Sequence, residues 1–291
     1  MKTHLIFSGG NIWGIVYLGI LRYLYINDLH IHIKDVAGTS FGASFAIIFA
    51  LKIPIELIEE QFYNFSENED MKFISINNIK NIFSDFGFIS THKYLGYLKK
   101  YIQDTYHKDD LTFIEISKMF GINLHINALC INTGKIVIFN VNNTPNTSII
   151  QACAASMSIP FIYKPEIIDN KYYIDPGLIQ NIMYDEFCNV PKDFILNVII
   201  NIDAVPNYDN ENLTFFQYIY NIFNIHLNIL FTYSMFNYIK ENKRNSIVIT
   251  DENLGMETII NSSGIYQNFD KIKIDKCIMY GYIISMDFFE K

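Results

Sequence analysis

The chain has 291 residues, of which 50% are hydrophobic and 18% are charged, so it carries enough apolar surface for a sizeable buried core. This composition excludes a chain that is mostly disordered. The formal net charge is −8 and no run of Lys or Arg resembles a nucleic-acid-binding surface, so we expect no nucleic-acid partner.

Cysteine usage and the N-terminal residues predict a cytoplasmic protein. Four cysteines lie in apolar contexts without CxxC spacing, as expected for reduced core residues: Cys130, Cys153, Cys188 and Cys277. The apolar stretch before Gly9 is too short for a signal peptide. The histidines are scattered, and the pair His30 and His32 lacks further spaced ligands, so we expect no metal site.

The first 52 residues contain two successive units, each with a short strand followed by glycines and a helix. "HLIF" at 4–7 predicts a buried strand, and apolar spacing over 14–27 predicts a helix. "VAGTS" at 36–40 predicts a second strand, followed by a small-residue helix over 41–52 that stops before Pro54. Two such units in succession are typical of an α/β fold with a parallel sheet.

The middle of the chain, roughly 55–120, is expected to be helical with loops, including a helix capped by Ser90 and one ending on Gly121. Strands and a short helix follow: strands at 122–132 and 135–140 joined by a turn at 133–134, a helix at 148–158, a turn at Pro160, and strands at 171–175 and 194–202. No repeat and no Pro/Ser-rich linker is visible, so a single domain over 1–291 is expected.

The stretch "GTSFG" places Ser40 between Gly38 and Gly42, where the second strand meets its helix. A serine on such a sharp turn has an exposed hydroxyl, small flanking residues let the two elements approach, and the helix N-terminus favours developing negative charge. A chance GxSxG match is expected only about 0.04 times in a chain of this composition. The alternative is a packing turn whose serine merely caps the helix.

If Ser40 is a nucleophile, it needs a base. A Ser-acid-His triad using His226 fits poorly, because α/β-hydrolases place several strands before the sharp turn that carries the nucleophile, and only 39 residues precede Ser40. A carboxylate in a dry pocket also serves, and Asp175, at the end of an apolar strand in "KYYIDPG", is the best candidate. Taken alone, an Asp before Pro-Gly is also an ordinary turn former.

Together these stretches resemble the patatin-like phospholipase family. Its pattern of a glycine-rich loop, a G-x-S-x-G elbow and a later Asp-Gly turn corresponds to "SGGNIWG" at 8–14, "GTSFG" at 38–42 and "DPG" at 175–177. The stretches 154–165 and 173–181 also resemble the family's run-up to its aspartate. The resemblance covers about residues 4–185, with weaker similarity in the C-terminal helix, and 186–291 would complete the domain.

The resemblance implies a three-layer α/β fold with a central, mostly parallel sheet and helices on both faces. It also implies an acyl hydrolase for phospholipid or lysophospholipid, working without metal or organic cofactor. By this resemblance Ser40 would attack an acyl ester and Asp175 would act as general base, while the amides around Gly9, Gly10 and Asn11 would form the oxyanion hole. Oligomeric state is not predicted.

Three positions depart from the family pattern. Asn11 stands where a third loop glycine is usual, Trp13 replaces a basic residue, and Pro176, which has no N–H, replaces the glycine after the aspartate. These departures leave open a catalytically impaired protein that binds lipid or a protein partner.

The stretch 213–239 is rich in aromatic residues and contains no charged ones. A polar stripe along it, made by Gln217, Asn221, Asn224 and Asn228, predicts an amphipathic rather than a transmembrane helix. It would either pack on the sheet or form an interfacial face, with Lys240, Lys243 and Arg244 near anionic head groups.

Overall fold

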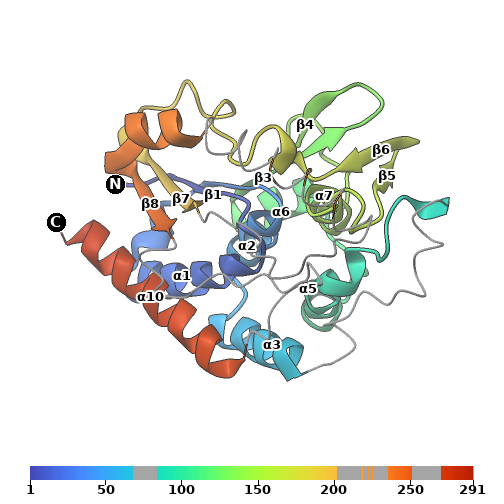
Figure 1. The fold of residues 1–291 in the computed structure, drawn as a ribbon. Helices are drawn as coiled ribbons and strands as arrows, with labels where there is room; N and C mark the ends of the chain where they lie inside the picture. The colour runs from blue at the N-terminus through green and yellow to red at the C-terminus, as the bar shows by residue number, and fades with distance from the viewer. Residues whose placement is uncertain are drawn as a thin grey trace.

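An eight-stranded mixed sheet runs through the molecule in the order β5-β6-β3-β2-β1-β7-β8, with β4 paired to β3 outside this path (Figure 1). The computed structural model describes residues 1–67, 84–201, 235–250 and 270–290, together with Tyr218, Ile222 and Ile225. The strands are β1 His4–Phe7, β2 Asp35–Gly38, β3 Asn123–Cys130, β4 Lys135–Phe139, β5 Glu166–Ile168, β6 Lys171–Ile174, β7 Ile195–Asn201 and β8 Ser246–Thr250.

The strands β3, β2, β1, β7 and β8 run parallel to one another, and β4, β5 and β6 add an antiparallel portion beside β3. This agrees with the predicted α/β fold and mostly parallel sheet. The hairpin between β3 and β4 is confirmed, and its turn contains Gly134 in the left-handed region at φ 65°. The short strands β5 and β8 were not predicted.

The helices follow the expected positions to within a residue or two in most cases. The α-helices are α1 Val16–Ile26, α2 Phe41–Ala50, α3 Ile55–Glu67, α5 His92–Tyr106, α6 Phe113–Phe120, α7 Ile149–Ser156 and α10 Lys271–Phe289. Short 3-10 turns are η1 Asn11–Ile15, η2 Leu29–His32, η5 Pro176–Leu178, η6 Lys192–Phe194 and η7 Lys243–Asn245. Thr91 occupies the N-cap position of α5 without a side-chain capping hydrogen bond, and the hydroxyl of the expected cap, Ser90, accepts the His92 amide at 3.3 Å.

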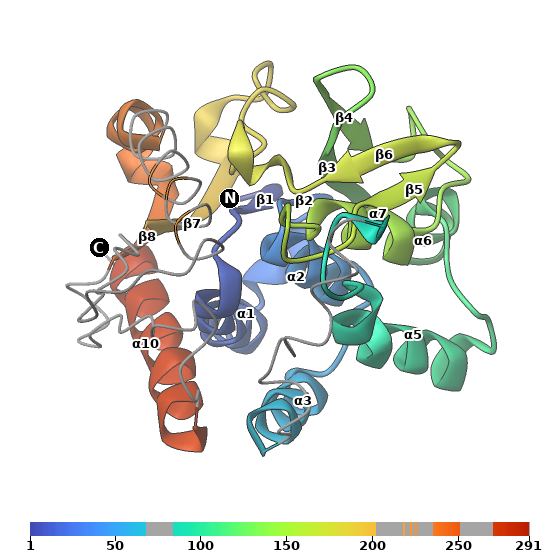
Figure 2. The same ribbon diagram turned by 45° about the vertical axis from the view of Figure 1, so that its right-hand side comes forward.

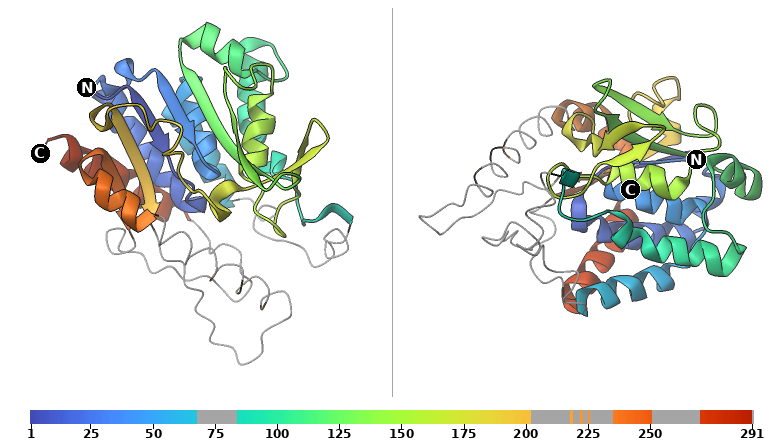
Figure 3. Two further views of the ribbon diagram at one scale, coloured as in Figure 1. Left: turned by 90° about the horizontal axis from the view of Figure 1, so that it is seen from above. Right: turned by 90° about the vertical axis from the view of Figure 1, so that its right-hand side faces the viewer.

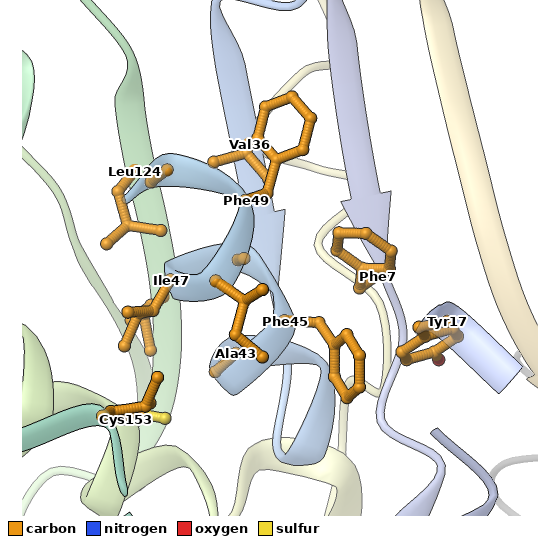
Figure 4. Packing of buried hydrophobic residues seen from close by; sticks show 14 of the residues in the cluster. Phe7, Tyr17, Val36, Ala43, Phe45, Ile47, Phe49, Leu124 and Cys153 are labelled. Carbon is orange, nitrogen blue, oxygen red and sulfur yellow. The ribbon is translucent and has the colours of Figure 1, made fainter. Parts of the chain in front are cut away.

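One face of the sheet carries the main core. Leu5 and Phe7 of β1 point to this face, where α2 packs across the parallel strands (Figure 4). Every residue of α2 after Phe41 is buried, because helices also cover its outer side, which explains why its sequence is apolar all round. Helix α10 lies along α1 on this side of the sheet (Figures 1 and 2).

The opposite face carries a second, smaller apolar cluster. Ile6 and Ala37, which alternate with the residues of the main core, contact Ile182, Phe187 and Met235. The second layer is therefore formed by the segment 182–190 and by helical residues 235–242. The layered arrangement is visible in Figure 3, where α3, α5 and α10 lie together on one side of the sheet.

The predicted aromatic helix 213–239 lies mostly outside the described residues, as do His226 and the polar stripe. Its described positions are helical: Tyr218, Ile222 and Ile225, which are exposed, and 235–239. Within the described part of the chain, no helix is both long enough and apolar enough to cross a bilayer.

Candidate active site

Ser40 occupies the sharp turn between the end of β2 and the start of α2. Its backbone has φ 53° and ψ −127°, a conformation that non-glycine residues rarely adopt and that costs about 1–3 kcal/mol. The turn is tight enough that a Cβ at Gly42 would lie 2.4 Å from the Ser8 carbonyl oxygen. Only glycine fits there, which is the steric reason for the second glycine of the "GTSFG" motif.

The strained turn is held by helix α7. The Ser40 amide donates a hydrogen bond of 2.7 Å to the hydroxyl of Ser156, the last residue of α7. Because Ser156 is fully buried, water does not compete with the Ser40 amide for this hydroxyl. The elbow is therefore anchored by a residue 116 positions away in the chain.

The Ser40 hydroxyl donates to Asp175 Oδ2 at 2.5 Å. Asp175 follows β6, and its other carboxylate oxygen accepts the Gly177 amide at 2.8 Å. The Asp175 amide in turn donates to the Ser158 carbonyl at 2.9 Å. The end of α7 thus holds both partners, Ser40 through Ser156 and Asp175 through Ser158.

Burial raises the pKa of Asp175 to about 6, although its hydrogen bonds from Ser40 and Gly177 pull the pKa in the other direction. At neutral pH the carboxylate is therefore ionised and can accept the hydrogen bond from Ser40. A pKa this close to neutrality suits a general base, which must be free to take up a proton and release it again.

Pro176 does not deprive Asp175 of its backbone donor. Pro176 is the first residue of η5, a position at which the backbone N–H of a helix has no partner in any case. The Asp175 carboxylate instead accepts the amide of Gly177, one residue further on. The departure at Pro176 therefore leaves the Asp175 turn intact. Asn11 has φ 54°, so the loop does use the left-handed backbone that asparagine tolerates.

The glycine-rich loop lies against the turn that follows Asp175. The Gly9 amide donates to the Asn181 main-chain carbonyl at 3.0 Å, and the Asn181 side-chain amide donates to the Gly9 carbonyl at 2.9 Å. The Gly9 amide therefore already has an acceptor here. The Gly10 amide makes no hydrogen bond with any described residue.

The structure also locates the other residues considered from the sequence. Gly38 approaches the Gly42 backbone, where a Cβ would lie 2.2 Å from the Gly42 carbonyl oxygen. Trp13 lies in η1, partly buried against the main core. Among the described residues, no three His, Cys, Asp or Glu side chains are arranged to hold a metal ion.

Sequence reasoning missed Ser156, Ser158 and Asn181. Ser156 and Ser158 stand in "AASMSIPFIYKP" and Asn181 ends "YIDPGLIQN", two stretches that resemble the family without naming a role for any of the three. The only signal available for the two serines was the run of small residues before Pro160. The roles of all three residues depend on contacts with other elements of the fold, which spacing along the chain does not reveal.

Comparison with known proteins identifies a matching family model and two viral relatives. The family model described as patatin-like phospholipase matches residues 5–187. A protein of Acanthamoeba polyphaga mimivirus is 27% identical over 175 residues, which is 60% of this chain and 57% of the viral protein. A probable lipid hydrolase of Invertebrate iridescent virus 6 is 27% identical over 189 residues, or 62% of this chain and 61% of the relative. The chain thus matches about three fifths of each viral relative's length.

Two solved structures share the fold at low sequence identity. VipD from Legionella pneumophila superposes with a TM-score of 0.59 at 17% identity, covering 99% of this chain and 67% of VipD. The type III effector ExoU from Pseudomonas aeruginosa gives a TM-score of 0.50 at 14% identity, covering 99% of this chain and 53% of ExoU.

Proposed function

Because the chain belongs to the patatin-like phospholipase family, we propose that it cleaves fatty-acyl esters of phospholipids or lysophospholipids with Ser40 as nucleophile and Asp175 as base. The observation that carries this proposal is the buried hydrogen bond from Ser40 Oγ to Asp175 Oδ2 at 2.5 Å. The name of the relative in Invertebrate iridescent virus 6, a probable lipid hydrolase, supports the same chemistry.

In the first half-reaction Ser40 Oγ attacks the ester carbonyl carbon and its proton passes to Asp175 Oδ2. The tetrahedral intermediate carries its negative charge on the former carbonyl oxygen. When this intermediate collapses, the bond to the alcohol breaks, and the alcohol leaves with the proton from Asp175. The acyl group then remains on Ser40 as an ester.

In the second half-reaction water attacks the acyl-serine and gives its proton to Asp175. Collapse of the second intermediate returns that proton to Ser40 Oγ and releases the fatty acid. The same carboxylate thus accepts and returns one proton in each half-reaction.

The oxyanion would be stabilised by the loop after β1 and by the N-terminus of α2. Donors held in advance by the fold are effective, since losing a single one costs about 10²–10³ in rate in acyl-transfer enzymes. The left-handed backbone of Asn11 and the Gly10 amide, which has no acceptor among the described residues, support a donor site in this loop. The N-terminal end of α2 adds its dipole directly behind Ser40.

We place the reaction at a lipid surface. Phe161 and Ile179, on the segments that precede and follow Asp175 in the chain, are 51% and 57% exposed and would contact acyl chains at such a surface. Lys243 and Arg244 are also exposed, but η7 directly precedes β8 and lies at the amino-terminal edge of the parallel strands, whereas Ser40 follows the carboxyl end of β2, so these two cations do not flank the site. Peripheral binding of this kind needs no membrane-spanning segment.

Hydrolysis of phosphatidylcholine vesicles, lysophosphatidylcholine and a soluble short-chain ester tests the proposal, with released fatty acid as the readout. Wild type and Ser285→Ala should release fatty acid and Ser40→Ala should not, since Ser285 is a buried helix serine bonded to Gly281 of its own helix. A folded wild type that binds vesicles and releases nothing would replace this proposal with the non-catalytic lipid-binding alternative.

A further inference from the structure

Asn181 makes two hydrogen bonds with the backbone of Gly9, one to its carbonyl and one from its amide. Its side-chain Nδ2 donates to the Gly9 carbonyl at 2.9 Å, and its main-chain carbonyl accepts the Gly9 amide at 3.0 Å. The Ser8 hydroxyl donates to the same Gly9 carbonyl at 2.8 Å, while it accepts the Ile200 amide at 3.0 Å. The Gly9 carbonyl therefore has two donors, and its direction is fixed.

Fixing that carbonyl also fixes the next amide. The described residues contain no cis peptide bonds, and in a planar trans peptide the C=O and the following N–H point in opposite directions. The peptide between Gly9 and Gly10 is flanked by two glycines, for which rotation of the whole peptide plane meets little steric resistance. Without an anchor on the Gly9 carbonyl, the direction of the Gly10 N–H would not be determined.

We propose that Asn181 is a positioning residue: its side chain locks the Gly9–Gly10 peptide so that the Gly10 N–H serves as an oxyanion donor. This inference rests on the proposed function and assigns the donor role within the loop. The Gly9 amide is engaged with Asn181, whereas the Gly10 amide has no acceptor among the described residues.

Steric contacts support the same arrangement. A Cβ at Gly9 would lie 2.2 Å from Asn181 Oδ1 and 3.1 Å from the Ser40 Cβ, so the Gly9 backbone is enclosed between the two side chains. A Cβ at Gly177, next to the Asp175 carboxylate, would lie 3.2 Å from the same Asn181 oxygen. One side chain thus contacts both the loop and the turn that carries the base.

Two substitutions test the role in complementary ways. Asn181→Asp keeps the size but sets an acceptor against the Gly9 carbonyl, and Asn181→Ala removes the donor without adding charge. The matched control is Gln180→Ala, because the neighbouring Gln180 side chain donates to Asp185 and not to the loop.

The readouts are kcat and KM for a short-chain ester, normalised to active sites titrated with a fluorophosphonate, together with the rate of that labelling. We expect both Asn181 variants to lose about 10²-fold in kcat with KM within twofold of wild type, because a small displacement of a catalytic donor is enough. The pH midpoint of Asn181→Ala should match wild type, since the Ser40–Asp175 bond is untouched. Gln180→Ala should match wild type in all respects.

Each other outcome overturns a defined part of the account. If wild type turns over and both Asn181 variants keep kcat within twofold, or change KM alone, the positioning role is wrong while the proposed function stands. If folded wild type neither turns over nor reacts with the probe, the proposed function is wrong, and this inference with it. Titration of active sites separates loss of folded protein from loss of rate.

Discussion

The Ser156 hydroxyl accepts the Ser40 amide hydrogen at 2.7 Å, so the last residue of one helix holds the first turn of another in a strained conformation. Ser158, two residues later, accepts the Asp175 amide through its carbonyl. The distance between the Ser40 and Asp175 side chains is therefore set by the short segment 156–158 at the end of α7. This arrangement makes the end of α7 as important to the site as the motifs themselves.

Ser156→Ala should reduce both activity and stability. It leaves the buried Ser40 N–H without an acceptor, which costs about 1–3 kcal/mol, and lets the strained turn relax away from Asp175. We expect at least about tenfold lower kcat from the misplaced nucleophile. Ser285→Ala is the matched control, because that serine is equally buried but bonds within α10. Equal kcat in the two variants, measured on titrated active sites, would contradict the role of Ser156.

The pKa of Asp175 predicts the pH dependence of the reaction. Because the base must be ionised and burial raises its pKa to about 6, kcat/KM should rise with pH and level off above neutrality, with a midpoint near 6. An uncharged ester as substrate keeps substrate titration out of the profile. A midpoint near the ordinary carboxyl value of 3.8 would contradict the raised pKa, and a profile independent of pH would contradict Asp175 as the base.

The same raised pKa predicts that Asp175→Asn stabilises the fold while abolishing turnover. Because the folded-state pKa exceeds the unfolded value of 3.8, the contribution of Asp175 to stability is full below pH 3.8 and is lost as pH rises through about 6. Asparagine escapes this loss: its oxygen accepts from Gly177 and its NH₂ faces Ser40.

Urea unfolding at pH 4 and pH 8 measures the effect. We expect Asp175→Asn to exceed wild type by about 2 kcal/mol at pH 8 and by much less at pH 4. If the stability advantage of Asp175→Asn over wild type is the same at pH 4 and pH 8, an ionised and buried Asp175 carboxylate is contradicted.

On the opposite face of the sheet, His125 lies between two carboxylates, Glu186 at 3.1 Å and Asp35 at 3.3 Å. Burial lowers the pKa of His125, but its bonds to these carboxylates outweigh burial and raise the pKa above 6.5. The stabilisation is thus full below pH 6.5 and is lost as pH rises through the folded-state pKa. Glu186 belongs to the segment that begins at Asn181, so this cluster also fixes the far end of that segment.

Glu186→Gln should therefore destabilise the protein by roughly 1 kcal/mol more at pH 6 than at pH 9. Glu166→Gln is the control, because Glu166 pairs with the half-exposed His92 at the surface, where such pairs contribute little. The prediction is tested by measuring the unfolding free energies of both variants at the two pH values. A pH-independent loss in Glu186→Gln would show that His125 is not charged in the folded protein.

Much of the fold was predictable because its signals are local. The strand-glycine-helix units at 4–27 and 36–52 carry their periodicity and their glycines within one short window, and both are found where expected. The strands β5 and β8 escaped prediction because each is only three to five residues long and depends on a neighbouring strand for its hydrogen bonds.

The site divides in the same way. Ser40 and Asp175 were predicted as site residues from motifs, and the structure brings their side chains into contact. Ser156 and Asn181 were not found, because each acts through a backbone group more than 100 residues away in the chain. The Gly9 amide is bound to Asn181, whereas the Gly10 amide has no acceptor in the part of the chain that the structure describes, and no spacing rule distinguishes the two amides.

Labelling with a fluorophosphonate probe, read by intact mass, tests the Ser40–Asp175 pair most directly. Purified wild type should gain one adduct, Ser40→Ala none, and Asp175→Asn should react far more slowly, because its serine lacks a base. A folded wild type that gains no adduct, or a Ser40→Ala protein that is labelled as fast as wild type, would contradict Ser40 as the nucleophile. Labelling of Asp175→Asn at the wild-type rate would contradict Asp175 as its base.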